Sequence, residues 1–334
     1  MIASAFFYLI MSGTAMAVVC VVGALLTYFV YGEAAAKEFV ETSAIRFNGI
    51  FVGAVGYGLF AFVRNWGKKT VALLEGVLEK PDEHAAQWGR QIERMTSWRW
   101  LLLIAGPLTV IGGIALWKAG FPLSGVPKYV MALGTISIYF VASGILAFYF
   151  FTILAFRFIE TRSLTHWASR FRLKSSFASL TLQTIDSFFV VSSTIGVLAI
   201  YLGFRGTLTA NFVGQSELFR KLMVLPLVFY LPATLCYSLY PRYVLRQLSE
   251  CDTLEMLEAL EKESVAEKHN DVTSRLEFRK LLLDVKEKIT NDRRAVPLLS
   301  IRDAPSLTMS IIIVIQFVAQ KDSVVSRFLQ GLFN

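Results

Sequence analysis

The stretch that decides the fold is residues 177–203, which read FASLTLQTIDSFFVVSSTIGVLAIYLG. Asp186 is its single charged residue, and the remainder is apolar or carries small polar side chains. A helix needs about 20 predominantly apolar residues to cross a hydrocarbon core of about 30 Å, and this stretch is longer than that. We therefore predict a transmembrane helix here.

Five other apolar runs, of 17 to 30 residues, are also long enough to cross. Hydrophobic residues make up 55% of the 334-residue chain and charged residues only 17%, against roughly 25% charged residues in soluble domains. The sequence thus predicts an all-α, polytopic membrane bundle of about six transmembrane helices. The further spans are expected at about 2–31, 47–63, 100–117, 129–156 and 220–240.

The distribution of Lys and Arg predicts the orientation of these spans. The net charge is +8, and the loops after the second and fourth spans are richer in basic residues than the alternate loops. By the positive-inside rule these loops and both termini are cytoplasmic, in a bacterial inner membrane or an equivalent plasma membrane. No basic stretch has the aromatic interleaving of a nucleic-acid-binding module, so the bilayer is the expected partner and nucleic acid is not.

Three segments outside the spans also carry predictions. Residues 70–97 form an amphipathic cytoplasmic segment, which either lies on the inner membrane surface or packs against the soluble part of the chain. Residues 241–334 are expected to form a small, mainly helical cytoplasmic domain, with a helix starting at Asp252. The apolar stretch 307–319 is too short to cross, which favours a buried element or a helix that dips into the membrane.

A polar stripe follows one side of the fifth span. At 100° per residue its polar side chains fall within one sector; they are Ser176, Ser179, Gln183, Asp186, Ser187, Ser193 and Thr194. A carboxylate inside a membrane is costly and must face water, a partner or another helix. The stripe therefore either lines an aqueous path or hydrogen-bonds to neighbouring helices.

Prolines and small residues give two further sets of candidates. Pro107, Pro226 and Pro232 lie inside predicted spans, where each removes a backbone donor and favours a hinge. Small residues recur at four-residue spacing in the second span, which is typical of close helix packing; they are Gly49, Gly53, Ala54 and Gly58.

These patterns favour a membrane channel or pore, forming a homo-oligomer, with a conduction path lined by the fifth span and gated or assembled by the tail. The alternative is a membrane anchor or scaffold that recruits a soluble protein partner through its tail, and a secondary transporter ranks third. The histidines are isolated, and no nucleotide, metalloprotease or nucleophile motif occurs. The sequence therefore predicts neither an enzyme nor a cofactor or metal site.

Overall fold

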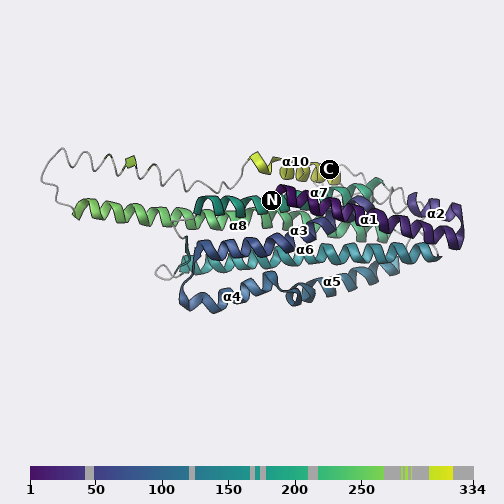
Figure 1. Cartoon of the computed structure of the whole chain (residues 1–334), viewed down its shortest axis with the longest axis horizontal. Coiled ribbons are helices and arrows are strands. Elements are labelled where there is room, and N and C mark those ends of the chain that lie inside the picture. The colour runs from purple at the N-terminus through teal and green to yellow at the C-terminus, as the bar shows by residue number, and fades with distance from the viewer. Residues whose placement is uncertain are drawn as a thin grey trace, which may run out of the picture.

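The computed structural model describes residues 1–41, 49–119, 125–165, 170–173, 178–209, 217–266, 280, 283, 284, 287 and 301–318. These residues are almost entirely helical, which confirms the all-α class. The helices lie roughly side by side in an elongated bundle, and α8 runs far past the others at one end (Figure 1).

The elements follow in a simple order along the chain. They are α1 (Ile2–Tyr31), α2 (Glu33–Val40), α3 (Gly49–Val77), β1 (Leu78–Glu79), α4 (Asp82–Thr96), α5 (Trp98–Ala119), α6 (Gly125–Thr165), β2 (Arg172–Leu173), α7 (Ala178–Thr209), α8 (Glu217–Ala266), the 3-10 helix η3 (Ile301–Asp303) and α10 (Ala304–Val318).

Within the described part of the chain, four helices are long and apolar enough to cross a membrane. Their apolar segments are Ile2–Tyr31, Trp98–Ala115, Ala132–Ser163 and Leu180–Gly203, and each overlaps a predicted span. Residues 49–63 of the predicted span 47–63 lie in the longer helix α3, and the predicted span 220–240 lies within α8. Crossing by these two segments stays a prediction, as does the orientation.

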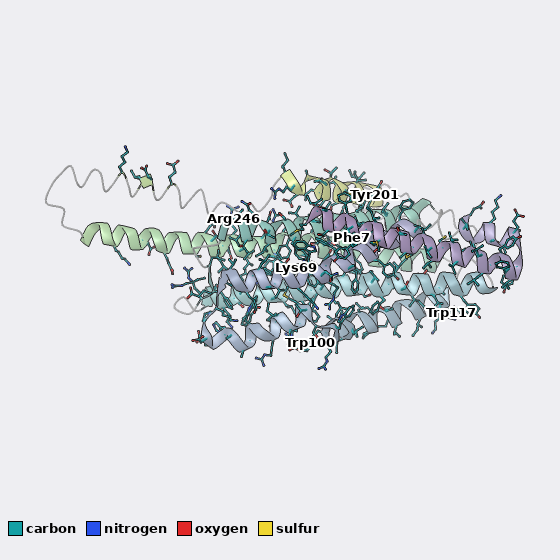
Figure 2. The ribbon with its side chains drawn as sticks, in the orientation of Figure 1. Phe7, Lys69, Trp100, Trp117, Tyr201 and Arg246 are labelled. Atoms are coloured by element: carbon teal, nitrogen blue, oxygen red, sulfur yellow. The ribbon has the colours of Figure 1, made fainter. Side chains whose placement is uncertain are left out.

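Trp100 and Trp117 lie toward opposite ends of α5, as expected of rings at two membrane surfaces (Figure 2).

Helix α1 lies on the outside of the bundle and packs along α3. Many of its large apolar side chains are exposed, Phe7 and Phe29 among them. Its contact with α3 is close at the small residues: a Cβ added at Gly53 would meet the Met16 side chain, and Gly13 lies beside Ala54. The structure thus turns the predicted small-residue face toward α1, except for Gly49, whose surroundings lie outside the described part.

Gly58 lies against the backbone of α1. A Cβ there would lie 3.0 Å from the Cα of Leu9, and backbone cannot yield as a flexible side chain can. We expect Gly58→Leu to destabilise the protein by about 1–3 kcal/mol, the usual cost of overpacking. Thermal unfolding in detergent checks this. Gly106→Leu is the matched control because a Cβ at Gly106 meets nothing within 4 Å; equal losses in the two variants would contradict the close contact.

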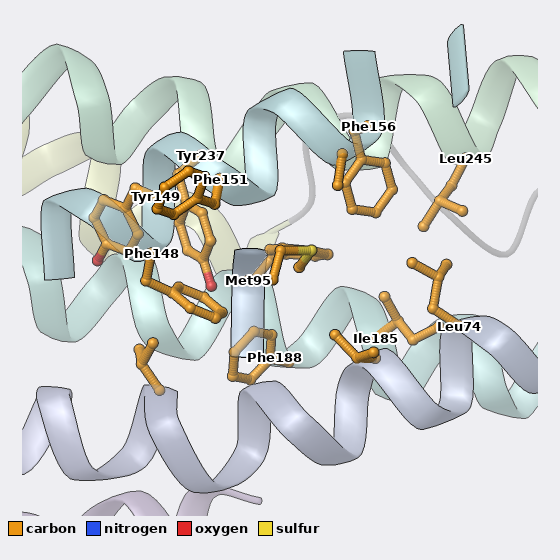
Figure 3. Packing of buried hydrophobic residues seen from close by; sticks show 14 of the residues in the cluster. Leu74, Met95, Phe148, Tyr149, Phe151, Phe156, Ile185, Phe188, Tyr237 and Leu245 are labelled. Atoms are coloured by element: carbon orange, nitrogen blue, oxygen red, sulfur yellow. The ribbon is translucent and has the colours of Figure 1, made fainter. Parts of the chain in front are cut away.

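The core between α3, α6, α7 and α8 is rich in aromatic rings. Tyr149 of α6 and Tyr237 of α8 stack with their ring centroids 3.9 Å apart. Phe188 of α7 meets Phe148 edge-on at 6.5 Å, and both rings lie in the same cluster (Figure 3). Aromatic side chains therefore fill this part of the core.

The end of the bundle that carries α4 and the two strands is here called the basic end. It is defined by Arg64, Arg94, Arg157, Arg162 and Arg242. The Arg64 guanidinium donates to the Thr96 carbonyl at 3.0 Å and lies 4.3 Å from the Trp98 ring centroid. The strands pair antiparallel, with Leu78 opposite Leu173.

The predicted amphipathic segment 70–97 consists of two helices in the structure. Residues 70–77 continue α3, and α4 packs against α6 with Trp88 and Met95 buried. The apolar face of α4 is therefore covered by α6, whereas the two predicted alternatives were the membrane surface and the soluble tail.

Helix α8 passes through the predicted domain boundary without a break. Residues 240 and 241 both lie inside it, and so does Asp252, so the prediction that a helix starts at Asp252 is wrong. A change of composition marks where apolar sequence ends, and a helix can continue past that point into charged sequence. A separate folded domain over 241–334 stays a prediction, since most of 267–300 and all of 319–334 lie outside the described residues.

Helix α10 covers most of the predicted short apolar stretch 307–319. It packs on α7, and Ile313 joins Val197, Ile200 and Leu231 in a small apolar cluster. Ile311 and Ile315 remain exposed. An exposed apolar face beside α7 is what a helix dipping into the membrane would present to lipid.

Candidate functional site

The predicted polar stripe of α7 does not share one environment. Gln183 is exposed, Ser187 and Thr194 are partly buried, and Asp186 and Ser193 are buried. Ser176 and the Ser179 side chain lie outside the described part. Protein therefore covers the stripe at Asp186, its charged residue.

Asp186 forms an ion pair with Arg242 of α8. The Arg242 Nε lies 2.6 Å from the Asp186 Oδ1, and the Arg242 Nη1 donates to the Asp303 Oδ1 at 2.8 Å. The exposed fractions are 4% for Asp186, 0% for Arg242 and 2% for Asp303. These three residues form a buried ion-pair cluster that joins α7, α8 and the start of α10.

Arg302 brings a second positive charge to this cluster. Its Nη1 lies 3.4 Å from the Ser187 Oγ, and it attracts the Asp186 carboxylate electrostatically. Arg302 is exposed, so the buried part of the cluster is one arginine between two aspartates. Because an unpaired buried charge is far more costly than a paired one, Arg242 explains how both aspartates are accommodated next to apolar helix faces.

Local sequence places Asp303 where a carboxylate is favourable. It is the residue before the first residue of α10, and a negative charge at a helix N-terminus is stabilised by the helix dipole. The Ser306 hydroxyl donates to the Asp303 carbonyl at 2.9 Å and the Ser310 hydroxyl to the Ser306 carbonyl at 2.7 Å. These two bonds lie within the first turns of α10. The contact between Asp303 and Arg242 places those turns beside α8.

The hydroxyl groups of the stripe donate to the backbone of their own helix. Ser187 donates to the Gln183 carbonyl at 2.7 Å, and Ser193 and Thr194 donate to the Val190 carbonyl at 3.0 and 2.8 Å. Hydroxyl groups satisfied in this way need no water. These hydroxyl bonds stay within α7, so they do not decide between an aqueous path and hydrogen bonding to neighbouring helices.

A second contact between charged residues links the strand region to α8. Arg170 is 3% exposed, and its Nη2 lies 2.7 Å from the Glu255 Oε2, which also lies 3.5 Å from the Arg172 Nη2. The segment 170–173 is therefore fastened to the part of α8 beyond the ion-pair cluster.

The predicted hinges lie inside uninterrupted helices. Pro107 is within α5, and Pro226 and Pro232 are within α8. Hinge motion at these prolines stays a prediction.

Sequence reasoning missed Arg242, Arg302 and Asp303. A signal existed, because Asp186 required a positively charged partner. Arg242 is the first charged residue after the sixth apolar run and directly follows Pro241. The sequence alone could not choose Arg242 over the neighbouring arginines, because the choice depends on which face of α8 meets α7.

In the described part of the chain, no group of three or more His, Cys, Asp or Glu side chains is placed to hold a metal ion. No protein-family model, curated protein or solved structure matches this chain.

Proposed function

We propose that this protein is a membrane anchor or scaffold whose bundle holds the projecting end of α8 for a soluble protein partner in the cytoplasm. The observation that carries the proposal is the continuity of α8 from the apolar bundle, through the ion-pair cluster, to Ala266. We propose no catalytic activity.

The length of α8 supports a projecting role. Its 50 residues correspond to about 75 Å of helix at 1.5 Å per residue. A hydrocarbon core is about 30 Å thick, so much of the helix must extend beyond the bilayer. Figure 1 shows this end passing the other described elements.

The contacts along α8 favour a rigid mounting. Arg242 binds it to α7 and α10, and Glu255 binds it to the segment 170–173. Beyond these contacts, Glu258 and Lys262 are exposed and, at a spacing of four residues, share one face of the helix. We propose that the partner binds this face.

Channel function stays a prediction, and the surroundings of Asp186 are the reason we favour the scaffold. The channel hypothesis depended on Asp186 facing water, whereas this carboxylate is paired and buried. Assembly into a homo-oligomer would be a separate property of either function and stays a prediction.

Photo-crosslinking in native membranes tests the scaffold proposal. A photoreactive amino acid replaces Glu258 or Lys262 in the full-length chain, and Val19, exposed on α1, carries it as the control. We expect one protein adduct of the same mass from both α8 positions and none from Val19. Adducts of equal pattern at all three positions, or none from α8, would contradict the proposal.

Planar-bilayer recording of purified protein tests the competing function. We expect no current from the wild type or from Asp186→Asn. A wild-type current whose ion selectivity changes in Asp186→Asn would favour the channel.

A further inference from the structure

A cavity of about 140 Å³ lies among α3, α6, α7 and α8. Its wall is almost wholly carbon, with Val52, Val141, Ile145, Ala199 and Ile200 among the lining residues. A cavity of similar size lined by aliphatic and aromatic side chains stays dry and accepts a ring of six carbon atoms. The space is therefore suited to an apolar occupant of about that size.

The cavity wall has few polar groups. One of them, the buried Tyr149 hydroxyl, makes no hydrogen bond to the described residues. Thr234 donates to the Tyr230 carbonyl at 2.8 Å. A single unpartnered hydroxyl among apolar side chains offers a polar ligand little hydrogen bonding, so a mainly hydrocarbon occupant fits this wall best.

The position of the cavity along the helices is the third observation. Val52 to Leu59 and Ile138 to Tyr149, which line it, lie in the middle of apolar stretches of α3 and α6. Gly196 of the lining is ten residues from Asp186, about 15 Å along α7. The cavity thus lies well inside the apolar part of the bundle, where the ends of lipid chains would be found.

We propose that this cavity binds the terminal segment, about six carbons long, of a membrane lipid acyl chain. The proposal rests on the membrane placement of the bundle and is independent of partner recruitment by α8. A bound chain would fill space between the four helices that otherwise lacks contacts, and would contribute to their packing.

Photolabelling of the full-length protein in lipid nanodiscs tests this inference. One phospholipid carries a diazirine at the chain end and a second carries it next to the glycerol. We expect the first lipid to label peptides containing residues 138–145 or 196–200, and the second to leave them unlabelled. Ala199→Leu fills the cavity and is expected to lower this labelling about tenfold, while Ala17→Leu, exposed on α1, leaves it unchanged.

A second variant separates lost binding from lost folding. A Cβ at Gly56 would lie 3.9 Å from the Val141 side chain, so Gly56→Val fills part of the cavity with ordinary contacts and is expected to lower the labelling too. Gel filtration and thermal unfolding verify that each variant is folded. The proposal would be overturned if only α1 were labelled, or if the wild type and the folded cavity-filled variants were labelled equally. Neither result would bear on the crosslinks from α8.

Discussion

Replacing Arg242 with alanine is expected to destabilise the protein by about 3–5 kcal/mol, the cost of removing one partner from a buried ion pair. Asp186 and Asp303 would be left buried together without the guanidinium that lies 2.6 and 2.8 Å from them. Their mutual repulsion would add to the loss of pairing. We expect α10 to leave α7, and thermal unfolding in detergent together with limited proteolysis after residue 266 measures both effects.

Two further variants separate the ion pairs from the general effect of losing an arginine. Arg246→Ala removes an exposed arginine one turn away, whose contact with Glu250 lies at the surface, and is expected to have little effect. Combining Asp186→Leu, Arg242→Met and Asp303→Leu should recover much of the stability, because apolar residues of similar volume often replace buried ion pairs without loss. A loss from Arg246→Ala as large as that from Arg242→Ala would contradict this account.

Trp88→Ala is expected to cost about 3–5 kcal/mol, the usual range for removing a large buried aromatic side chain. Trp88 is 1% exposed and meets Phe171 edge-on at 5.7 Å between centroids. Since α4 packs on α6 through this face, its loss should loosen α4 and the neighbouring strands while the apolar helices remain folded. Protease cleavage between residues 78 and 97 should therefore appear before global unfolding.

Trp98→Ala is the control for this prediction. Trp98 is 49% exposed, so its truncation removes less buried surface and should cost less. If the two variants lost equal stability, or if Trp88→Ala left α4 resistant to protease, the buried packing of α4 would not be what holds the basic end together.

The helices themselves were largely predictable because long apolar runs leave few alternatives in a membrane. The segments 2–31, 100–117, 129–156 and 177–203 each overlap a helix that could cross. Helix ends were less predictable. Pro241 and the charges after it suggested a boundary, but a helix keeps its backbone hydrogen bonds where apolar sequence gives way to charged sequence, and α8 continues past this point.

The partner of Asp186 could not be predicted from the sequence. Helical periodicity placed Asp186 on one face of α7 together with Ser187 and Ser193, but periodicity does not identify what lies opposite that face. The answer depends on how α8 and α10 pack, which brings Arg242 and Asp303 next to a residue far away in the sequence. The sequence therefore located the polar face and left its environment open.

Thiol labelling at position 193 tests most directly whether this face is closed by protein. Ser193 is 1% exposed, and cysteine is close to serine in size. In a chain whose Cys20, Cys236 and Cys251 have been replaced by alanine, Ser193→Cys in nanodiscs should resist a charged, water-soluble thiol reagent until the protein is denatured, whereas Glu258→Cys should react at once. Reaction of Ser193→Cys in the folded protein as fast as Glu258→Cys would mean that water reaches the stripe, and would contradict the account.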